Sequence, residues 1–310
     1  MEYYLLVVLS QVMLGLALFT EKLFSKRTAG YLPTNLIYSA GIAISSLFIY
    51  SVLAGFNLSP DWEIISHSLV YGMLYAASMT CLFISYKRLN MVVYSVFGKS
   101  ASIAVCVIGI MFFGDTVKAT TIIGIVLLFI SILLPLFESN ETSGKKSSVA
   151  NILICLATMI IGTGVSLVIK SFTELSSYTP ARASAMYFYA NIFTFIFLLV
   201  AVLIYTKQPA QHAGQTHLER HLNGFRDSLL RVNPKLYVLV PIVATVANIP
   251  TVINSVCIKY MDLSVYTVLS KALELAVLFC ISRFMFKEKH SKIDITALII
   301  SGVAGLVICF

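Results

Sequence analysis

Two lysines in otherwise apolar stretches are the residues of this chain whose chemistry is most informative. Lys99 lies nine residues beyond Asn90, and Lys271 lies eight residues beyond Leu263. At 1.5 Å per helical residue these spacings give depths of about 14 Å and about 12 Å, near the middle of a hydrocarbon core about 30 Å thick. A charge there costs about 2.5–3.5 kcal/mol unless it faces water or a partner. We therefore expect both ammonium groups to line an aqueous cavity; the alternative is a structural ion pair between helices.

Glu274 follows Lys271 by three residues and so shares its helical face. Two interpretations remain open. The carboxylate either only neutralises Lys271, or it is protonated and deprotonated to couple transport to a proton gradient. Two lysines and one carboxylate leave a net positive cavity, which favours an anionic or zwitterionic substrate.

Uncharged polar side chains inside apolar stretches are further candidates for substrate binding. Tyrosines near span ends are also typical of the interfacial belt, and asparagines also join helices. Lys22 and Lys170 lie near the ends of their stretches, where a lysine reaches the interface. We interpret Glu21 as interfacial too, and a role in the cavity is the alternative. The uncharged candidates are Tyr94, Tyr266, Tyr75, Tyr187, Asn191, Asn248 and Asn254.

The composition indicates that these groups lie in segments that span a membrane. Of 310 residues, 58% are hydrophobic and 12% are charged, and the mean hydropathy is +0.90; a soluble domain has roughly 25% charged residues. This excludes a soluble enzyme, a disordered chain and a disulfide scaffold. The six cysteines lie singly in apolar stretches, so we expect neither a disulfide nor a metal site. We also expect no cofactor and no nucleic-acid partner.

Ten apolar segments are each long enough to cross a bilayer. Lysines and arginines in the connecting loops number fifteen after odd-numbered segments and three after even-numbered ones. Because basic loops stay in the cytoplasm, both termini are predicted to face outward. The segments run near 3–24, 32–55, 63–86, 90–113, 118–137, 149–172, 181–206, 234–258, 263–286 and 292–310.

The longest loop, 207–233, contains a predicted amphipathic helix between Thr216 and Arg231. Its leucines and Phe225 recur at helical spacing with arginines between them, a pattern typical of a helix on a membrane surface. His217 and His221 lie four residues apart, but the H-E-x-x-H pattern of zinc proteases is absent.

The chain contains an internal repeat. Residues 87–99 (KRLNMVVYSVFGK) align with 259–271 (KYMDLSVYTVLSK), and five of the thirteen positions are identical. Segments 1–5, residues 1–138, therefore match segments 6–10, residues 149–310. Because five is odd, the second half enters the membrane from the opposite side. The predicted fold is an all-α integral membrane protein with ten transmembrane helices arranged as two inverted five-helix repeats, a common plan of secondary transporters. Glu274 has Ser102 as its counterpart, so it breaks the repeat.

The pattern resembles the drug/metabolite transporter (DMT) superfamily, EamA type. Gly114-Asp115 and Ile123-Gly124 match the family's motifs in the first half, and Lys287-Glu288 and Thr296-Ala297 match them less well in the second. The resemblance covers nearly the whole chain. It implies a central cavity lined by spans 1–4 and 6–9, and alternating access between rocking halves. Sugar-phosphate and nucleotide-sugar carriers of this superfamily place basic residues in spans 4 and 9, as Lys99 and Lys271 are placed. Family members commonly have cytoplasmic termini, contrary to the loop charges here.

The sequence thus predicts a secondary active transporter in a bacterial plasma (inner) membrane. It carries a small polar, anionic or zwitterionic metabolite through a central cavity, with a proton or an exchanged metabolite as coupling partner. The alternatives are a flippase for a lipid-linked sugar, an amphipathic drug exporter, and, in another class, a non-transporting scaffold or an intramembrane enzyme. No G-x-S-x-G or H-E-x-x-H supports an enzyme, and no G-x-x-x-x-G-K-[ST] supports an ATP-driven pump.

Overall fold

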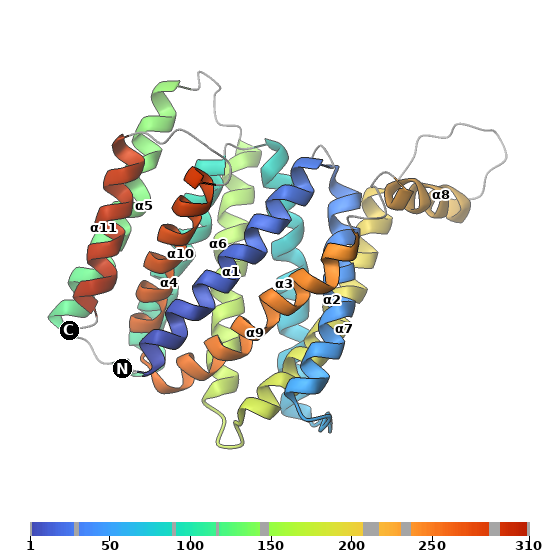
Figure 1. The fold of residues 1–310 in the computed structure, drawn as a ribbon, viewed down its shortest axis with the longest axis horizontal. Helices are drawn as coiled ribbons and strands as arrows, with labels where there is room; N and C mark the ends of the chain where they lie inside the picture. The colour runs from blue at the N-terminus through green and yellow to red at the C-terminus, as the bar shows by residue number, and fades with distance from the viewer. Residues whose placement is uncertain are drawn as a thin grey trace. The chain divides into compact units, whose positions relative to one another are not determined.

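The fold is helical throughout the part of the chain that the structure, a computed structural model, describes (Figure 1). The described residues are 2–27, 31–88, 91–115, 118–142, 149–206, 217–230, 237–284 and 292–308, and at some positions within them only the backbone is described. The helices are α1 (Glu2–Arg27), α2 (Leu32–Leu53), α3 (Trp62–Arg88), α4 (Met91–Phe112), α5 (Ala119–Thr142), α6 (Val149–Thr173), α7 (Pro180–Tyr205), α8 (His217–Leu230), α9 (Leu239–Tyr260), α10 (Leu263–Phe284) and α11 (Lys292–Ile308).

Each of the ten predicted apolar segments overlaps one of these helices. Within the described residues, seven stretches are long and apolar enough to cross a membrane, and they lie in α1, α2, α3, α6, α7, α9 and α10. The helices α4, α5 and α11 contribute shorter apolar stretches. The lengths and hydropathy are compatible with an integral membrane protein.

The chain forms two compact units, and each unit draws on both halves of the sequence. The first, called here the α5–α11 unit, contains Met1–Leu16, Arg88–Tyr178 and Ile249–Phe310. The second, the α2–α7 unit, contains Ala17–Lys87 and Thr179–Asn248. Of the four passages between the units, two lie well inside helices, within α1 and within α9, and a third separates the last two residues of α3.

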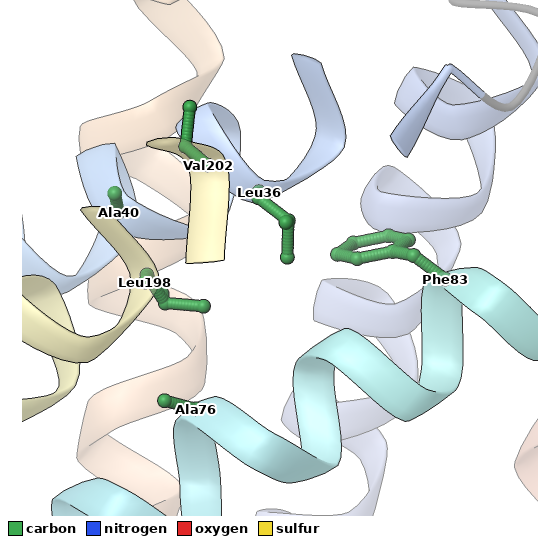
Figure 2. Close-up of a cluster of buried hydrophobic side chains, with 6 residues drawn as sticks. All are labelled: Leu36, Ala40, Ala76, Phe83, Leu198 and Val202. Carbon is green, nitrogen blue, oxygen red and sulfur yellow. The ribbon is translucent and has the colours of Figure 1, made fainter. Parts of the chain in front are cut away.

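In the α2–α7 unit, the core lies where α2, α3 and α7 meet. Figure 2 shows its buried apolar side chains, which come from the first part of α2, the second part of α3 and the end of α7. The other end of α2 meets the beginning of α7, since the rings of Tyr50 and Tyr187 stack with centroids 5.4 Å apart. The two helices therefore run antiparallel. The cluster consists of Leu36, Ala40, Ala76, Phe83, Leu198 and Val202.

Close approach of α3 to α7 depends on a glycine. A Cβ at Gly72 would lie 2.7 Å from the carbonyl oxygen of Ala190, so no larger residue fits without moving the backbone. Nearby, the Thr194 hydroxyl donates to the carbonyl of Gly72 at 3.4 Å. At the start of the same two helices, Arg182 pairs with Asp61 at 2.6 Å.

In the α5–α11 unit, α5 and α11 lie side by side and antiparallel (Figure 1). The hydroxyl of Ser131 donates to the carbonyl of Ala297 at 2.9 Å. Leu128, earlier in α5, packs in one cluster with Ala304, later in α11. The antiparallel pairing of α5 with α11 thus has the same form as that of α2 with α7.

The predicted amphipathic helix in the long loop is confirmed as a helix, α8. It packs against the ends of α2 and α7. The Thr34 hydroxyl donates to the buried Ser228 carbonyl at 2.9 Å, and a Cβ at Gly224 would clash with the backbone of Thr206. Specific packing therefore fixes α8 at these helix ends, beyond any attraction to a membrane surface.

The turn after α4 caps another helix of its own unit. Asp115 is 7% exposed, and its Oδ2 accepts a hydrogen bond of 2.7 Å from the backbone N–H of Ser264, in the first turn of α10. The first N–H groups of a helix lack partners within it, and a carboxylate there also opposes the positive end of the helix dipole. Gly109 leaves room for this carboxylate, because a Cβ there would lie 2.6 Å from Oδ2.

We expect Asp115→Ala to destabilise the protein by about 1–3 kcal/mol, because the substitution leaves a buried N–H without its charged acceptor. Asp115→Asn, which keeps an acceptor oxygen, should lose less. Thermal unfolding of the detergent-purified chain measures both, with Glu2→Ala at an exposed position of α1 as the control. Equal melting temperatures for Asp115→Ala and the wild type would contradict the capping role.

Candidate functional site

Lys271 and Glu274 form an ion pair along one face of α10. The ammonium Nζ lies 2.5 Å from Oε2 of Glu274, and the side chains are 33% and 21% exposed. This geometry matches the expectation that the two residues share a helical face. Of the two interpretations of Glu274, this contact supports the neutralisation of Lys271.

The other predicted residues of the α5–α11 unit have different surroundings. Tyr266 packs among apolar residues, Val7 and Cys257 in one cluster and Ile258 in another. The Oδ1 of Asn254 is buried, and no described residue hydrogen-bonds to it. The same is true of the hydroxyl of Ser102, the repeat counterpart of Glu274. Asn254 thus keeps an unused acceptor, whereas Tyr266 serves packing. The side chains of Lys99 and Tyr94 lie outside the described part of the structure.

The side chain of Lys170 is buried, whereas its position in the sequence predicted that it would extend to the interface. Its side chain is 6% exposed and forms an ion pair of 2.7 Å with Glu174, one turn later. The ammonium group also donates to the carbonyl of Ile258 at 3.4 Å and lies 5.9 Å from the ring centroid of Phe113. Lys170 therefore ties α6 to α9 inside the unit. Sequence position alone did not indicate that a carbonyl of α9 would be within reach.

In the α2–α7 unit, Tyr75 and Tyr187 belong to one row of four aromatic rings. Tyr50 stacks on Tyr187, Tyr187 meets the edge of Tyr71 at 5.4 Å, and Tyr71 stacks on Tyr75 at 5.8 Å. Three of the rings are buried, and Tyr75, which is half-buried, ends the row. We call Tyr50, Tyr187, Tyr71 and Tyr75 the tyrosine row. The row explains why Tyr71 and Tyr75 lie four residues apart on α3.

The two predicted asparagines of this unit make structural hydrogen bonds. Asn191 donates to the carbonyl of Tyr187 in its own helix at 2.8 Å. Asn248 is buried and donates to the hydroxyl of Ser46 on α2 at 2.6 Å. Of the two interpretations open for asparagines, inter-helix contact fits Asn248. The unit thus contains Tyr75, Tyr187, Asn191 and Asn248, of which Tyr187 and Asn248 are buried and Tyr75 is half-buried.

Glu21, which sequence reasoning assigned to the interface, belongs to the same unit. Its Oε2 is buried, and no hydrogen-bond donor among the described residues reaches it. Ala17 and Phe24, one turn before and after it on α1, are buried, so this face of α1 points into the unit. The signal was present in the sequence, since Ala17, Glu21 and Phe24 recur at the spacing of one helical face. A buried carboxylate oxygen without a partner costs about 1–3 kcal/mol or more, which makes Glu21 a functional candidate.

Comparison with known proteins identifies a fold but no family. No family model and no curated protein matches the chain. A solved structure titled "Crystal structure of protein" is similar to it with a TM-score of 0.63 and 13% sequence identity, over 98% of this chain and 94% of the other. At that identity the likeness concerns the fold, and it shows that this arrangement of helices occurs over the full length of another chain.

We expect the two halves of the Lys271–Glu274 pair to depend on each other. Lys271→Met alone leaves a carboxylate without its partner in an apolar helix, so it should destabilise the protein more than the double variant Lys271→Met/Glu274→Gln does. A double-mutant cycle on thermal stability should give a coupling of about 0.5–3 kcal/mol. Strictly additive effects would show that the pair is not a unit; the Lys170–Glu174 pair provides a second cycle for comparison.

Proposed function

We propose that the protein is a secondary active transporter of a small polar metabolite. The observation that carries the proposal is the Lys271–Glu274 pair, which lies in the middle of an apolar helix and is partly exposed. Ionisable groups at such depth mark substrate or ion pathways, because they are too costly where they meet only lipid. A structural protein of the membrane would be more stable with apolar residues at both positions.

The helix pairing supports the inverted repeat on which the proposal depends. Segments 2 and 7 (α2 and α7) are antiparallel partners, and so are segments 5 and 10 (α5 and α11). Each pair joins one segment to its counterpart five segments later. Counterparts of an inverted repeat lie on opposite sides of its two-fold axis and run in opposite directions. We infer ten spans in two inverted halves of the DMT superfamily, EamA type.

The charges favour an anionic or zwitterionic substrate over a simple cation. Lys271 is paired with Glu274, so the pair alone is neutral, and protonation of the carboxylate would leave an ammonium group for a carboxylate or phosphate of the substrate. Glu274 is then the coupling residue of the proposal, and Lys99 supplies the second positive charge. The lipid-linked sugar flippase and drug exporter remain variants of this proposal.

We expect a thermal-shift screen with phosphates, nucleotide sugars, amino acids and amines to find a stabilising ligand, and that ligand to be transported into proteoliposomes. Lys271→Ala and Lys99→Ala should each abolish the flux while the protein stays folded, because both remove a charge that the substrate meets. Lys118→Ala, at an exposed loop position, is the control. Normal flux in both lysine variants would disprove the site assignment.

The loop charges predict that both termini face away from the cytoplasm. In a bacterial inner membrane, alkaline phosphatase fused to the C-terminus should be active, and a fluorescent protein fused there should stay dark. The opposite result would give this chain the cytoplasmic termini common in the family it resembles.

A further inference from the structure

We propose that the connection between α2 and α3 anchors the α2–α7 unit in the interfacial layer of a lipid bilayer, through the side chains of Phe56 and Trp62. The site lies wholly within that unit. It goes beyond the proposed transport function, because the connection can bind the bilayer interface whether or not the protein carries a substrate.

Trp62 begins an exposed apolar stripe on α3. It is the first residue of the helix and of the apolar stretch long enough to span a membrane, and it is 82% exposed. Three more exposed apolar residues follow it after seven, eight and eleven positions, which places them on the same helical face. On a spanning helix such a face meets lipid, so its first residue is expected where the hydrocarbon ends. The stripe consists of Trp62, Leu69, Val70 and Met73.

Phe56 lies at the same end of the unit, three residues after the spanning stretch of α2 ends at Leu53. It is 70% exposed. The helix before it carries an exposed apolar face of its own, formed by Ile44, Phe48 and Val52 at intervals of four residues. Phe56 and Trp62 therefore lie at the ends of two exposed apolar surfaces, the depth at which aromatic side chains are enriched in membrane proteins.

The backbone conformation at Phe56 is unfavourable for a phenylalanine. Its φ is +59°, in the left-handed region that glycine adopts without steric cost, and Gly55 before it has a φ of +62°. A second glycine at position 56 would relieve the strain. Because the side chain of Phe56 is exposed, it gains little from packing inside the unit, and we attribute its gain to contact outside. Conformations of this kind concentrate at functional positions.

Polar contacts hold the connection against α7. The carboxylates of Asp61 and Glu63 both pair with Arg182, at 2.6 Å and 3.1 Å. The hydroxyl of Tyr189 donates to the carbonyl of Leu58 at 2.6 Å. A connection that is already ordered loses little conformational freedom when its rings enter lipid. The charged groups beside the rings are paired with each other, at the level where the lipid headgroups would lie.

A bilayer is the occupant that fits both rings. The exposed apolar faces that lead to Phe56 and Trp62 belong to two helices long and apolar enough to span a membrane. A second copy of the chain or a soluble protein would cover the rings but would leave these continuous faces unexplained.

The test uses the intrinsic fluorescence of the full-length chain, because Trp62 is its only tryptophan. The protein is reconstituted into phosphatidylcholine bilayers that carry bromine, which quenches tryptophan on contact, either near the headgroup or near the end of the acyl chains. Shallow bromine should quench Trp62 at least about twofold more strongly than deep bromine. Absence of quenching by either lipid would show that water or another protein covers the ring, and would overturn the proposal, as would stronger quenching by deep bromine.

Two variants move the reporter within the same unit. Met73→Trp combined with Trp62→Phe places it eleven residues further along the same face, about 16 Å deeper and near the middle of the core, so deep bromine should quench it more strongly. Phe56→Trp combined with Trp62→Phe should again be quenched more strongly by shallow bromine. The same order in the Met73→Trp variant as in the wild type, or no quenching in the Phe56→Trp variant, would overturn the proposal. The wild-type measurement needs no substitution, so it is decisive even where a variant does not fold.

Discussion

The cost of an ionisable group inside an apolar helix is the constraint that organises this protein. Four such groups meet it in three ways. Lys170 is enclosed by Glu174, a backbone carbonyl and an aromatic ring, and so is fully compensated. Lys271 and Glu274 compensate each other but stay partly exposed. Glu21 keeps a buried oxygen without a donor among the described residues. Compensation is thus most complete at Lys170 and least complete at Glu21.

The two compact units are built on the same scheme. In each, a helix of the first half of the sequence lies antiparallel to a helix of the second half, and small residues or hydroxyl groups lie where helices meet. Ser131 bonds across to α11, and Gly72 allows α3 to approach α7. Where helices are surrounded by lipid, such packing and hydrogen bonds contribute most of their association. Each unit therefore depends on both halves of the sequence, and neither half contains a complete unit.

Sequence periodicity and hydropathy predicted the helices well, because both depend on local residues. The amphipathic helix of the long loop is present as α8, and the i, i+3 spacing of Lys271 and Glu274 gave their contact. Neither signal indicates which residues from distant segments come into contact. Lys170 was placed at the interface because the sequence does not show that the carbonyl of Ile258, on another helix, lies within hydrogen-bond distance. The tyrosine row joins α2, α3 and α7, and no spacing within one helix indicates that Tyr50 meets Tyr187. Glu21 was interpreted as interfacial because it adjoins a basic residue, and the buried face that Ala17 and Phe24 mark was not considered.

The chain passes from one compact unit to the other inside α1, between Leu16 and Ala17, and inside α9, between Asn248 and Ile249. At these two places the units are joined by continuous helix and not by a loop. Pro250 lies beside the second passage, where its missing N–H removes one hydrogen bond of the helix and weakens resistance to bending. Bending therefore costs less in α9 near Pro250 than in α1, which contains no proline.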